Sequence, residues 1–227
     1  MSATVRYLLE RVSQPEIEPI TLAEAKRHIR GFANQTSEDS DIEDWIVVAR
    51  QMIEHYTARA LVDQRWKLTV DTRQTTGDAV GGYSSSIEVE AGACLLATRG
   101  VYLRRSPVLD VVQVATIAED GEETVVDPAH YALRDAGTKA PRVVPISGSS
   151  WINGPFAITF RAGYADRTGS PITGAEAIPA CLKHGVKLLI GVFDENRSPI
   201  VIGSISGEIP IGIRHVVEPE NANLGLA

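Results

Sequence analysis

The sequence predicts an α+β protein, in which a helical subdomain of three main helices carries an inserted antiparallel β subdomain. Apolar residues recur at helical spacing near both ends of the chain, and they alternate with polar residues in its middle. Gly and Pro mark the changes between the two periods. The expected parts are an N-terminal helical part at 1–63, the β subdomain at 64–170, a helix at 171–198 that completes the helical subdomain, and an extended C-terminal docking arm at 199–227.

The composition fits a globular chain with a sizeable core, because 44% of the 227 residues are apolar and 22% are charged. The net charge of -7 argues against a protein that coats duplex DNA by neutralising phosphates. Cys94 and Cys181 lack metal-ligand spacing, and no stretch approaches the length of a membrane span. We therefore expect a protein of a reducing cytoplasm, with no cofactor, no metal and no membrane contact.

The N-terminal part predicts two helices. Thr21 and Glu24 have the spacing of a capping box, and Ser40 and Glu43 repeat that pattern at the start of a longer helix. The apolar stripe of the longer helix recurs every three or four residues, at Ile42, Trp45, Ile46, Ala49, Met52, Ile53 and Tyr56. We expect three of these side chains to hold the helices together, namely Trp45, Ile46 and Ile53.

The third main helix is expected after Pro179, which suits a first turn. Its apolar positions recur at helical spacing, at Leu182, Val186, Leu189, Ile190 and Phe193. Gly185 and Gly191 lower the helix propensity by about 1 kcal/mol each, unless another segment packs closely there. Pro199 ends the helix.

The β subdomain begins where Trp66, Leu68 and Val70 alternate with polar residues. Further strand candidates are Ile87–Glu90, Val101–Arg104, Val111–Ala118, Thr124–Val126, Tyr131–Arg134, Arg142–Val144 and Phe156–Arg161. Asp120-Gly121 predicts a hairpin turn. The polar stretch Thr72–Ser86, rich in Gly and Ser, predicts a loop.

Catalytic and metal-binding motifs do not emerge from the sequence. Gly207 and Gly212 have P-loop spacing, but Ile213-Arg214 stands where Lys and Ser or Thr are required. The five histidines never pair at metal-ligand spacing. Two alternatives stay open: a small cytoplasmic hydrolase that uses Asp166 and His130, and a small DNA-binding module whose basic face comprises Arg104, Arg105 and Arg142.

The order of several segments resembles the head-tail connector proteins, also called adaptor or head-completion proteins, of long-tailed phages and gene transfer agents. The segments are "ITLAEAKRHIR", "DIEDWIVVARQMIEHYTARALVDQRWKLTVD", "VYLRRSPVLDVVQVATIAEDGEETVVDPAHYAL", "FAITFRAGYAD" and "IPACLKHGVKLLIGVFDENR". The resemblance covers most of residues 18–213, and its evidence lies in the order of the motifs. The segment 72–98 is longer than the connection expected in that family.

This resemblance implies a non-enzymatic ring subunit, commonly in twelve copies, in the neck of a virion assembled in the host cytoplasm. The implied partners are a portal protein, a tail or stopper protein, further copies of the chain, and DNA that passes through a channel without sequence recognition. C-terminal segments in the family commonly dock onto the portal. On this basis we expect Ile209, Ile211, Ile213 and Val216 to bind the portal, and Arg104 and Arg105 to face the DNA channel or a partner.

An energy estimate supports the expectation of an extended arm. Nine large aliphatic residues lie between Ile200 and Val217, and burying each contributes about 1.5 to 3 kcal/mol. Ordering the backbone opposes this by about 1 to 2 kcal/mol per residue. Because the two sums overlap, we expect the segment to order on a partner; the alternative is that it folds back over its own helices.

Overall fold

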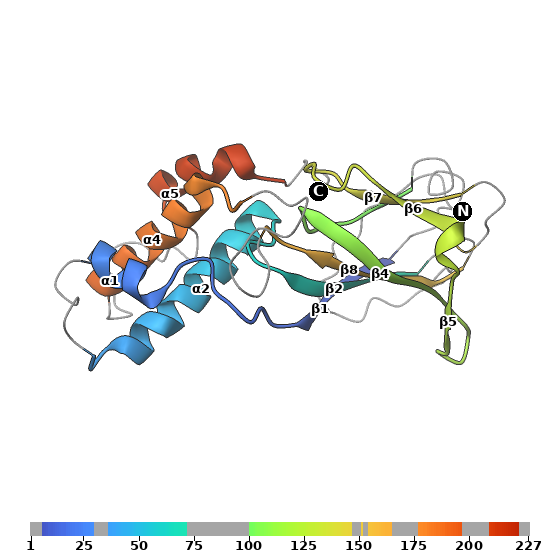
Figure 1. Cartoon of the computed structure of the whole chain (residues 1–227), viewed down its shortest axis with the longest axis horizontal. Helices are drawn as coiled ribbons and strands as arrows, with labels where there is room; N and C mark the ends of the chain where they lie inside the picture. Colours follow the sequence, from blue (N-terminus) through green and yellow to red (C-terminus); the bar gives the residue numbers. More distant parts are fainter. Residues whose placement is uncertain are drawn as a thin grey trace. The chain divides into compact units, whose positions relative to one another are not determined.

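The computed structural model describes residues 6–29, 36–71, 100–146, 151, 154–164, 177–196 and 209–222. It has the predicted α+β composition (Figure 1). The helices are α1 (Leu22–Ile29), α2 (Asp39–Thr57), α4 (Ala180–Glu195) and α5 (Ile211–Val217), with short 3-10 turns η1 (Pro128–His130) and η3 (Glu218–Glu220). The strands are β1 (Arg6–Ser13), β2 (Gln64–Asp71), β3 (Val101–Tyr102), β4 (Val108–Ile117), β5 (Glu123–Val125), β6 (Tyr131–Arg134), β7 (Arg142–Pro145) and β8 (Phe156–Ala162).

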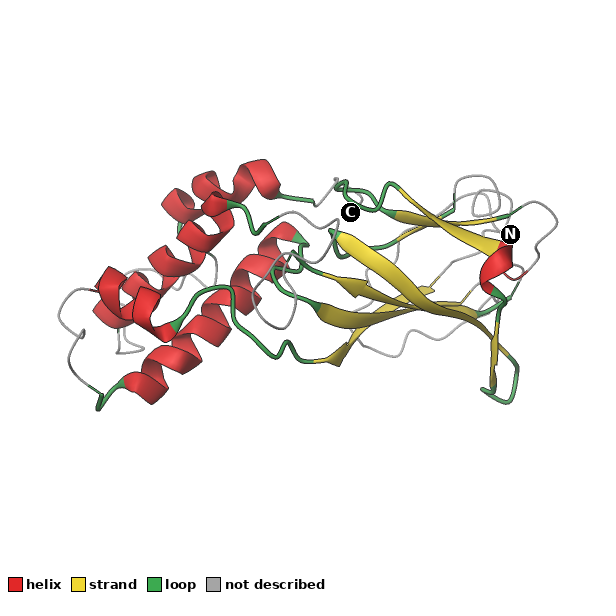
Figure 2. Ribbon diagram, in the orientation of Figure 1, coloured by secondary structure: helices red, strands yellow, loops and turns green. Residues whose placement is uncertain are grey.

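The chain divides into two compact units, which Figure 2 distinguishes by their helices and strands. The β unit takes Met1–Gln14 and Asp63–Gly163, and the helical unit takes Pro15–Val62 and Tyr164–Asn223. The expectation that the N-terminal helical part begins at residue 1 is wrong, because Arg6–Ser13 forms strand β1, pairs with β2 and belongs to the β unit. The predicted boundaries at 170/171 and 198/199 lie outside the described residues.

The β unit contains two antiparallel sheets, of strand orders β1-β2-β8-β4-β5 and β3-β7-β6. The alternation read in the sequence is confirmed in β2, where Trp66, Leu68 and Val70 are buried and the residues between them are more exposed. Trp66 and Leu68 lie opposite Phe160 and Ile158 of β8, so one face of the larger sheet is apolar. The predicted strand Ile87–Glu90 and the loop at 72–86 lie outside the described residues.

The turn between β4 and β5 is the hairpin that Asp120-Gly121 predicted. Gly121 has φ +88°, which a residue with a side chain rarely adopts. The amide N–H of Ala118 donates to the carbonyl of Glu122 at 2.9 Å and closes the turn. The β5 strand that follows is only three residues long.

The helical unit has one apolar core, to which α1, α2, α4 and α5 contribute. As predicted, Ile46 and Ile53 are buried in it and Trp45 packs against it partly buried. The capping box of α1 is confirmed, because the Thr21 N–H donates to the Glu24 carboxylate at 2.9 Å and the Glu24 N–H donates to Thr21 Oγ1 at 3.2 Å.

The predicted cap of the second helix is wrong. α2 begins at Asp39, its N-cap is Glu38, and no side chain caps it, so Ser40 lies inside the first turn. A Lys26–Asp39 ion pair joins this first turn to α1 instead. The observed start lies within one or two residues of the predicted one, which is the usual uncertainty of a helix end.

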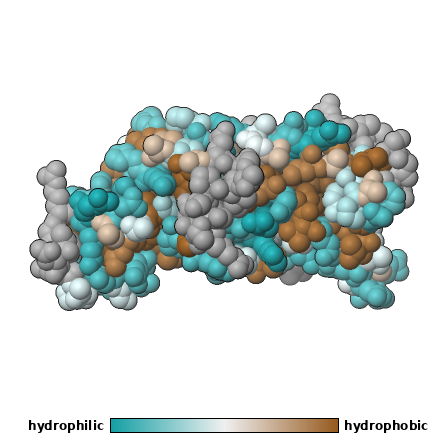
Figure 3. Space-filling model, in the orientation of Figure 1, coloured by the Kyte–Doolittle hydropathy of each residue, from teal (hydrophilic) through white to brown (hydrophobic). Residues whose placement is uncertain are grey.

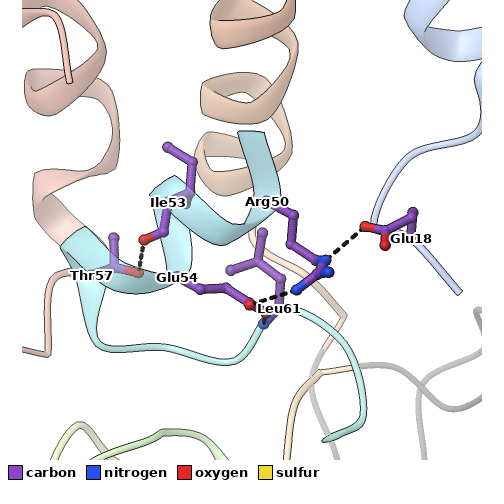
Figure 4. A network of polar contacts seen from close by, with 6 residues as sticks. All are labelled: Glu18, Arg50, Ile53, Glu54, Thr57 and Leu61. Atoms are coloured by element: carbon purple, nitrogen blue, oxygen red, sulfur yellow. Dashed lines mark hydrogen bonds and ion pairs between the residues drawn. The ribbon is translucent and has the colours of Figure 1, made fainter. Parts of the chain in front are cut away.

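A buried polar network fixes the end of α2 (Figure 4). The Arg50 side chain is only 1% exposed, and its guanidinium donates to Glu54 at 2.8 Å and to Glu18 at 2.7 Å. The second carboxylate oxygen of Glu54 accepts the backbone N–H of Leu61 at 2.9 Å. The Arg50–Glu54 pair thus connects the turn after α2 and the segment before α1 to the α2 helix itself.

Candidate interaction surfaces

The C-terminal residues that the sequence marked for portal binding form a helix, not an extended arm. Pro210 precedes α5 in an extended conformation, with φ -51° and ψ 139°. The Pro210 carbonyl accepts the N–H groups of Ile213 at 2.9 Å and Arg214 at 3.0 Å. Ile213 and Val217, four residues apart on one face of α5, are both buried in the core of the helical unit.

A glycine of α4 lets α5 approach closely. A Cβ atom placed on Gly185 would lie 2.6 Å from Cγ1 of Val217 and 3.3 Å from Cδ1 of Ile53. The first separation is shorter than real Cβ contacts and the second is tighter than most of them, so only Gly fits under Val217 without a shift of its neighbours. The close packing that would offset the low helix propensity is therefore present at Gly185. At Gly191 the nearest atoms, on the His28 ring, are 3.8 Å and 4.0 Å away.

Polar contacts hold the segment after α5 to the end of α2. Tyr56 Oη donates to the Glu218 carboxylate at 2.5 Å, and this hydrogen bond is the main cause that raises the pKa of Tyr56. The Arg59 guanidinium contacts the Glu220 carboxylate at 2.9 Å and its carbonyl at 2.7 Å. The Ala222 N–H donates to the Thr57 carbonyl at 2.8 Å.

The four predicted portal-binding residues therefore lie in two different environments. Ile209 and Ile213 are 7% and 4% exposed and belong to the core. Ile211 is 71% exposed, and Val216 packs against the core while partly exposed. The expectation of an extended arm is wrong for residues 209–222, and the alternative that the segment folds back over its own helices holds for them. Residues 199–208 lie outside the described part of the chain.

The predicted basic pair lies in the β unit just after β3. The Arg104 guanidinium lies 5.6 Å from the ring centroid of Tyr7, and the Arg105 guanidinium lies 4.7 Å from that of Trp66. Arg11 also approaches the Trp66 ring, at 6.0 Å. We name these five residues the arginine–aromatic cluster. Burial raises the pKa of Tyr7, and the positive charge of Arg104 opposes that rise.

The arginine–aromatic cluster changes what the two arginines offer to a partner. Both side chains are partly buried, so their charges sit over rings of β1 and β2 rather than at the ends of freely extended chains. Arg142, the third member of the proposed DNA-binding face, contacts the Asp135 carboxylate at 3.0 Å. In a basic face built from these three arginines, the charge of Arg142 is thus partly neutralised, and Arg104 and Arg105 lie against aromatic rings.

Of the two residues of the hydrolase alternative, the structure describes only His130. The carbonyl of His130 accepts the Trp151 indole N–H at 3.1 Å and the Ile146 N–H at 3.0 Å, which are structural contacts. Asp166 lies outside the described residues. Within the described ranges, no group of three or more His, Cys, Asp or Glu side chains is placed to hold a metal ion, and no helix is long and apolar enough to cross a membrane.

Comparison with solved structures identifies chains of the same fold. A chain of the "Virion of native gene transfer agent (GTA) particle" aligns over 94% of this chain and 95% of its own, with a TM-score of 0.64 and 22% identity. A chain of the "Neck of empty GTA particle computed with C6 symmetry" aligns over the same shares, with a TM-score of 0.62 and 24% identity.

A third likeness, to a chain of the "Neck of native GTA particle computed with C12 symmetry", covers 94% of both chains, with a TM-score of 0.57 and 20% identity. No family model matches the sequence, and neither does any curated protein. The chain thus has, over nearly its whole length, the fold of chains found in gene transfer agent particles.

Proposed function

We propose that this chain is a structural subunit of the neck of a phage or phage-like particle. The observation that carries the proposal is the likeness in fold over 94% of the chain to proteins of gene transfer agent necks. The order of the sequence motifs independently resembles the same class of protein. In this role the chain is an adaptor that performs no catalysis and needs no cofactor.

The adaptor forms a ring, binds the portal at the capsid vertex, and joins it to the tail or stopper. The C12 and C6 symmetries of the similar necks support a closed ring of copies, for which twelve is our proposed number. The net charge of -7 suits a channel wall that lets DNA slide without gripping it. Arg104 and Arg105 face this channel or a partner, and assembly takes place in the host cytoplasm.

The exposed side of α5 is the proposed portal contact. Ile211 remains 71% exposed although its neighbours in sequence, Ile209 and Ile213, are buried, so a large aliphatic side chain stays available to a partner. Full burial of such a side chain contributes about 1.5 to 3 kcal/mol. Val216 is partly exposed on the same short helix, about 140° around its axis from Ile211, so we propose that it contacts the portal at the margin of this surface.

Binding to portal rings tests this proposal. The chain is mixed with purified portal rings of its particle, and the bound fraction is measured by co-sedimentation and electron microscopy. We expect Ile211→Asp to weaken binding at least about tenfold, since about 1.4 kcal/mol corresponds to that factor. Val48→Asp, at a 45% exposed position of α2, is the matched control.

Three outcomes would contradict the proposal or part of it. If the unmodified chain does not bind portal rings, the adaptor role is wrong. If Ile211→Asp and Val48→Asp bind equally well, the α5 surface is wrong. Salt-sensitive retention on bare duplex DNA, without portal binding, would favour the DNA-binding module instead.

A further inference from the structure

The arginine–aromatic cluster lies on the core-facing side of strand β1, within the β unit. Arg11 is directly opposite Trp66 in the β1–β2 pairing, and residues placed in this way point to the same side of a sheet. From the segment that follows β3 of the smaller sheet, Arg104 reaches the ring of Tyr7 and Arg105 reaches that of Trp66. Two segments far apart in sequence thus bring three positive charges to one place.

Arg11 differs from other arginines that the fold withdraws from water. Buried or partly buried arginines elsewhere in the described chain contact a carboxylate, namely Arg50, Arg59, Arg142 and Arg161. Arg11 is partly buried as well, but none of the ion pairs among the described residues includes it, and its guanidinium lies 6.0 Å from the Trp66 ring centroid. A guanidinium donates two parallel hydrogen bonds most favourably to a carboxylate or a phosphate. Arg11 therefore carries donors that suit an anionic partner.

The indole of Trp66 supplies a further donor at the same place. Trp66 is 7% exposed, and its buried Nε1 has no hydrogen-bond partner in the described structure. The indole N–H of Trp151, by contrast, donates to the His130 carbonyl. Buried N–H groups in folded proteins nearly always have an acceptor, so a bound oxygen atom that accepts from Nε1 would be stabilising. Because the guanidinium groups of Arg11 and Arg105 both approach this ring, an acceptor that carries negative charge is favoured.

The surroundings of the cluster favour a protein carboxylate over a DNA phosphate. Exposed apolar side chains neighbour the cluster in sequence, since Leu8 is 53% and Val12 56% exposed on β1, and Tyr102 is 40% exposed on β3. Figure 3 also shows apolar side chains gathered on the side of the β unit turned to the viewer. Apolar surface of this kind is typical of contacts between proteins. Surfaces that bind DNA are strongly positive, whereas the net charge of this chain is -7.

We propose that the arginine–aromatic cluster binds an acidic segment of a protein partner. A carboxylate of that segment accepts from the Arg11 guanidinium and from Trp66 Nε1, and the charges of Arg104 and Arg105 add to the attraction. Stacking on a ring uses the flat face of a guanidinium, so the N–H groups in its plane point past the ring toward a partner. The inference rests on the proposed neck function and names the chemistry of the partner that Arg104 and Arg105 face.

A glutamate peptide tests the site without the particle. Fluorescein-labelled hexaglutamate is titrated with the full chain at low ionic strength, and binding is measured by fluorescence anisotropy. With unlabelled peptide, the indole N–H resonance of Trp66 is followed by NMR, after identification with Trp66→Phe or by elimination with Trp45→Phe and Trp151→Phe. We expect saturable binding that shifts this resonance. Arg11→Gln should weaken binding about tenfold or more. Arg65→Gln, which removes the same charge from an exposed position of β2, is the matched control and should leave the affinity nearly unchanged.

Several results would overturn the proposal. If hexaglutamate does not bind, or if Arg11→Gln and Arg65→Gln weaken it equally, the cluster is not a carboxylate site. If a short DNA duplex shifts the Trp66 resonance and hexaglutamate does not, the cluster is a phosphate site. Since portal binding is measured separately, peptide binding without portal binding would refute only the neck function, and portal binding without peptide binding would refute only this site.

A conservative variant separates paired hydrogen bonds from general electrostatic attraction. Arg11→Lys keeps the positive charge but loses the planar guanidinium that donates two parallel bonds. We expect it to recover only part of the affinity that Arg11→Gln loses, and to shift the Trp66 resonance less than the unmodified chain does at saturation. Urea midpoints equal to that of the unmodified protein show that both variants fold. Full affinity of Arg11→Lys, with an unchanged Trp66 shift, would refute donation by the guanidinium.

Discussion

The close packing of α5 on α4 determines whether Gly185→Ala stabilises or destabilises the protein. Replacing Gly by Ala inside an exposed helix stabilises it by about 1 kcal/mol. At Gly185, however, the new Cβ would lie 2.6 Å from Cγ1 of the fully buried Val217. Overpacking of a core costs about 1 to 3 kcal/mol, and Val has little rotamer freedom with which to move away. We therefore expect Gly185→Ala to lower the free energy of unfolding by about 1 kcal/mol or more.

Urea unfolding, followed by far-UV circular dichroism, measures this effect and isolates its cause. Gly191→Ala is the matched control, because the nearest atoms to its Cβ would lie 3.8 Å away, and it should stabilise the protein by about 1 kcal/mol. In a Val217→Ala background the clash is removed, so Gly185→Ala should become stabilising. If Gly185→Ala stabilises the unmodified protein as much as Gly191→Ala does, α5 does not pack on α4 in solution, and the C-terminal segment is the free arm that the sequence suggested.

Two further predictions concern buried and surface carboxylates, and both are checked by the free energy of unfolding. Glu54→Ala should cost about 1 to 3 kcal/mol, because it leaves the buried Leu61 N–H without its acceptor and removes one of the two carboxylates that pair with Arg50, which keeps Glu18; a loss below about 1 kcal/mol would contradict the buried pair. The hydrogen bond from the Thr21 N–H, more than Lys187 at 3.7 Å, lowers the pKa of Glu24. The stability that the charged Glu24 carboxylate contributes is therefore present above its unfolded-state pKa and lost as the pH falls through its folded-state pKa. Glu24→Ala should cost about 1 kcal/mol at neutral pH and less in acid, whereas Glu119→Ala, in an exposed turn, should show no such pH-dependent difference.

The main helices and most strands could be predicted because their apolar residues follow one clear period. Trp66, Leu68 and Val70 face a core on one side only, so the alternation survives in the sequence. β1 was missed because its sequence, RYLLERVS, places apolar residues on both faces, of which Leu8 and Val12 stay exposed. An edge strand of this kind is specified by its pairing with β2, which lies more than fifty residues away in sequence.

The C-terminal helix was missed for a different reason. Gly212 and Pro210 argue against regular structure, and the energy estimate treated eighteen residues as one unit that orders together. The signal that could have found α5 is the four-residue spacing of Ile209, Ile213 and Val217, with Pro210 directly before the first turn. The contacts of Arg104 and Arg105 could not be predicted, because Tyr7 and Trp66 meet them only through the folding of the sheet.

Burial of α5 limits how this chain can bind a portal through its C-terminus. If the whole segment left its site, Ile213 and Val217 would leave the core, and truncations of buried aliphatic residues of this kind cost about 2 to 5 kcal/mol each. The contacts of Glu218 and Glu220 with Tyr56 and Arg59 would be lost as well. The contacts with a partner would have to offset this whole loss of free energy before the released segment could bind tightly. Docking through the exposed Ile211 avoids that cost, which is why we propose the portal contact on the outward side of α5 and not on an arm released from the core.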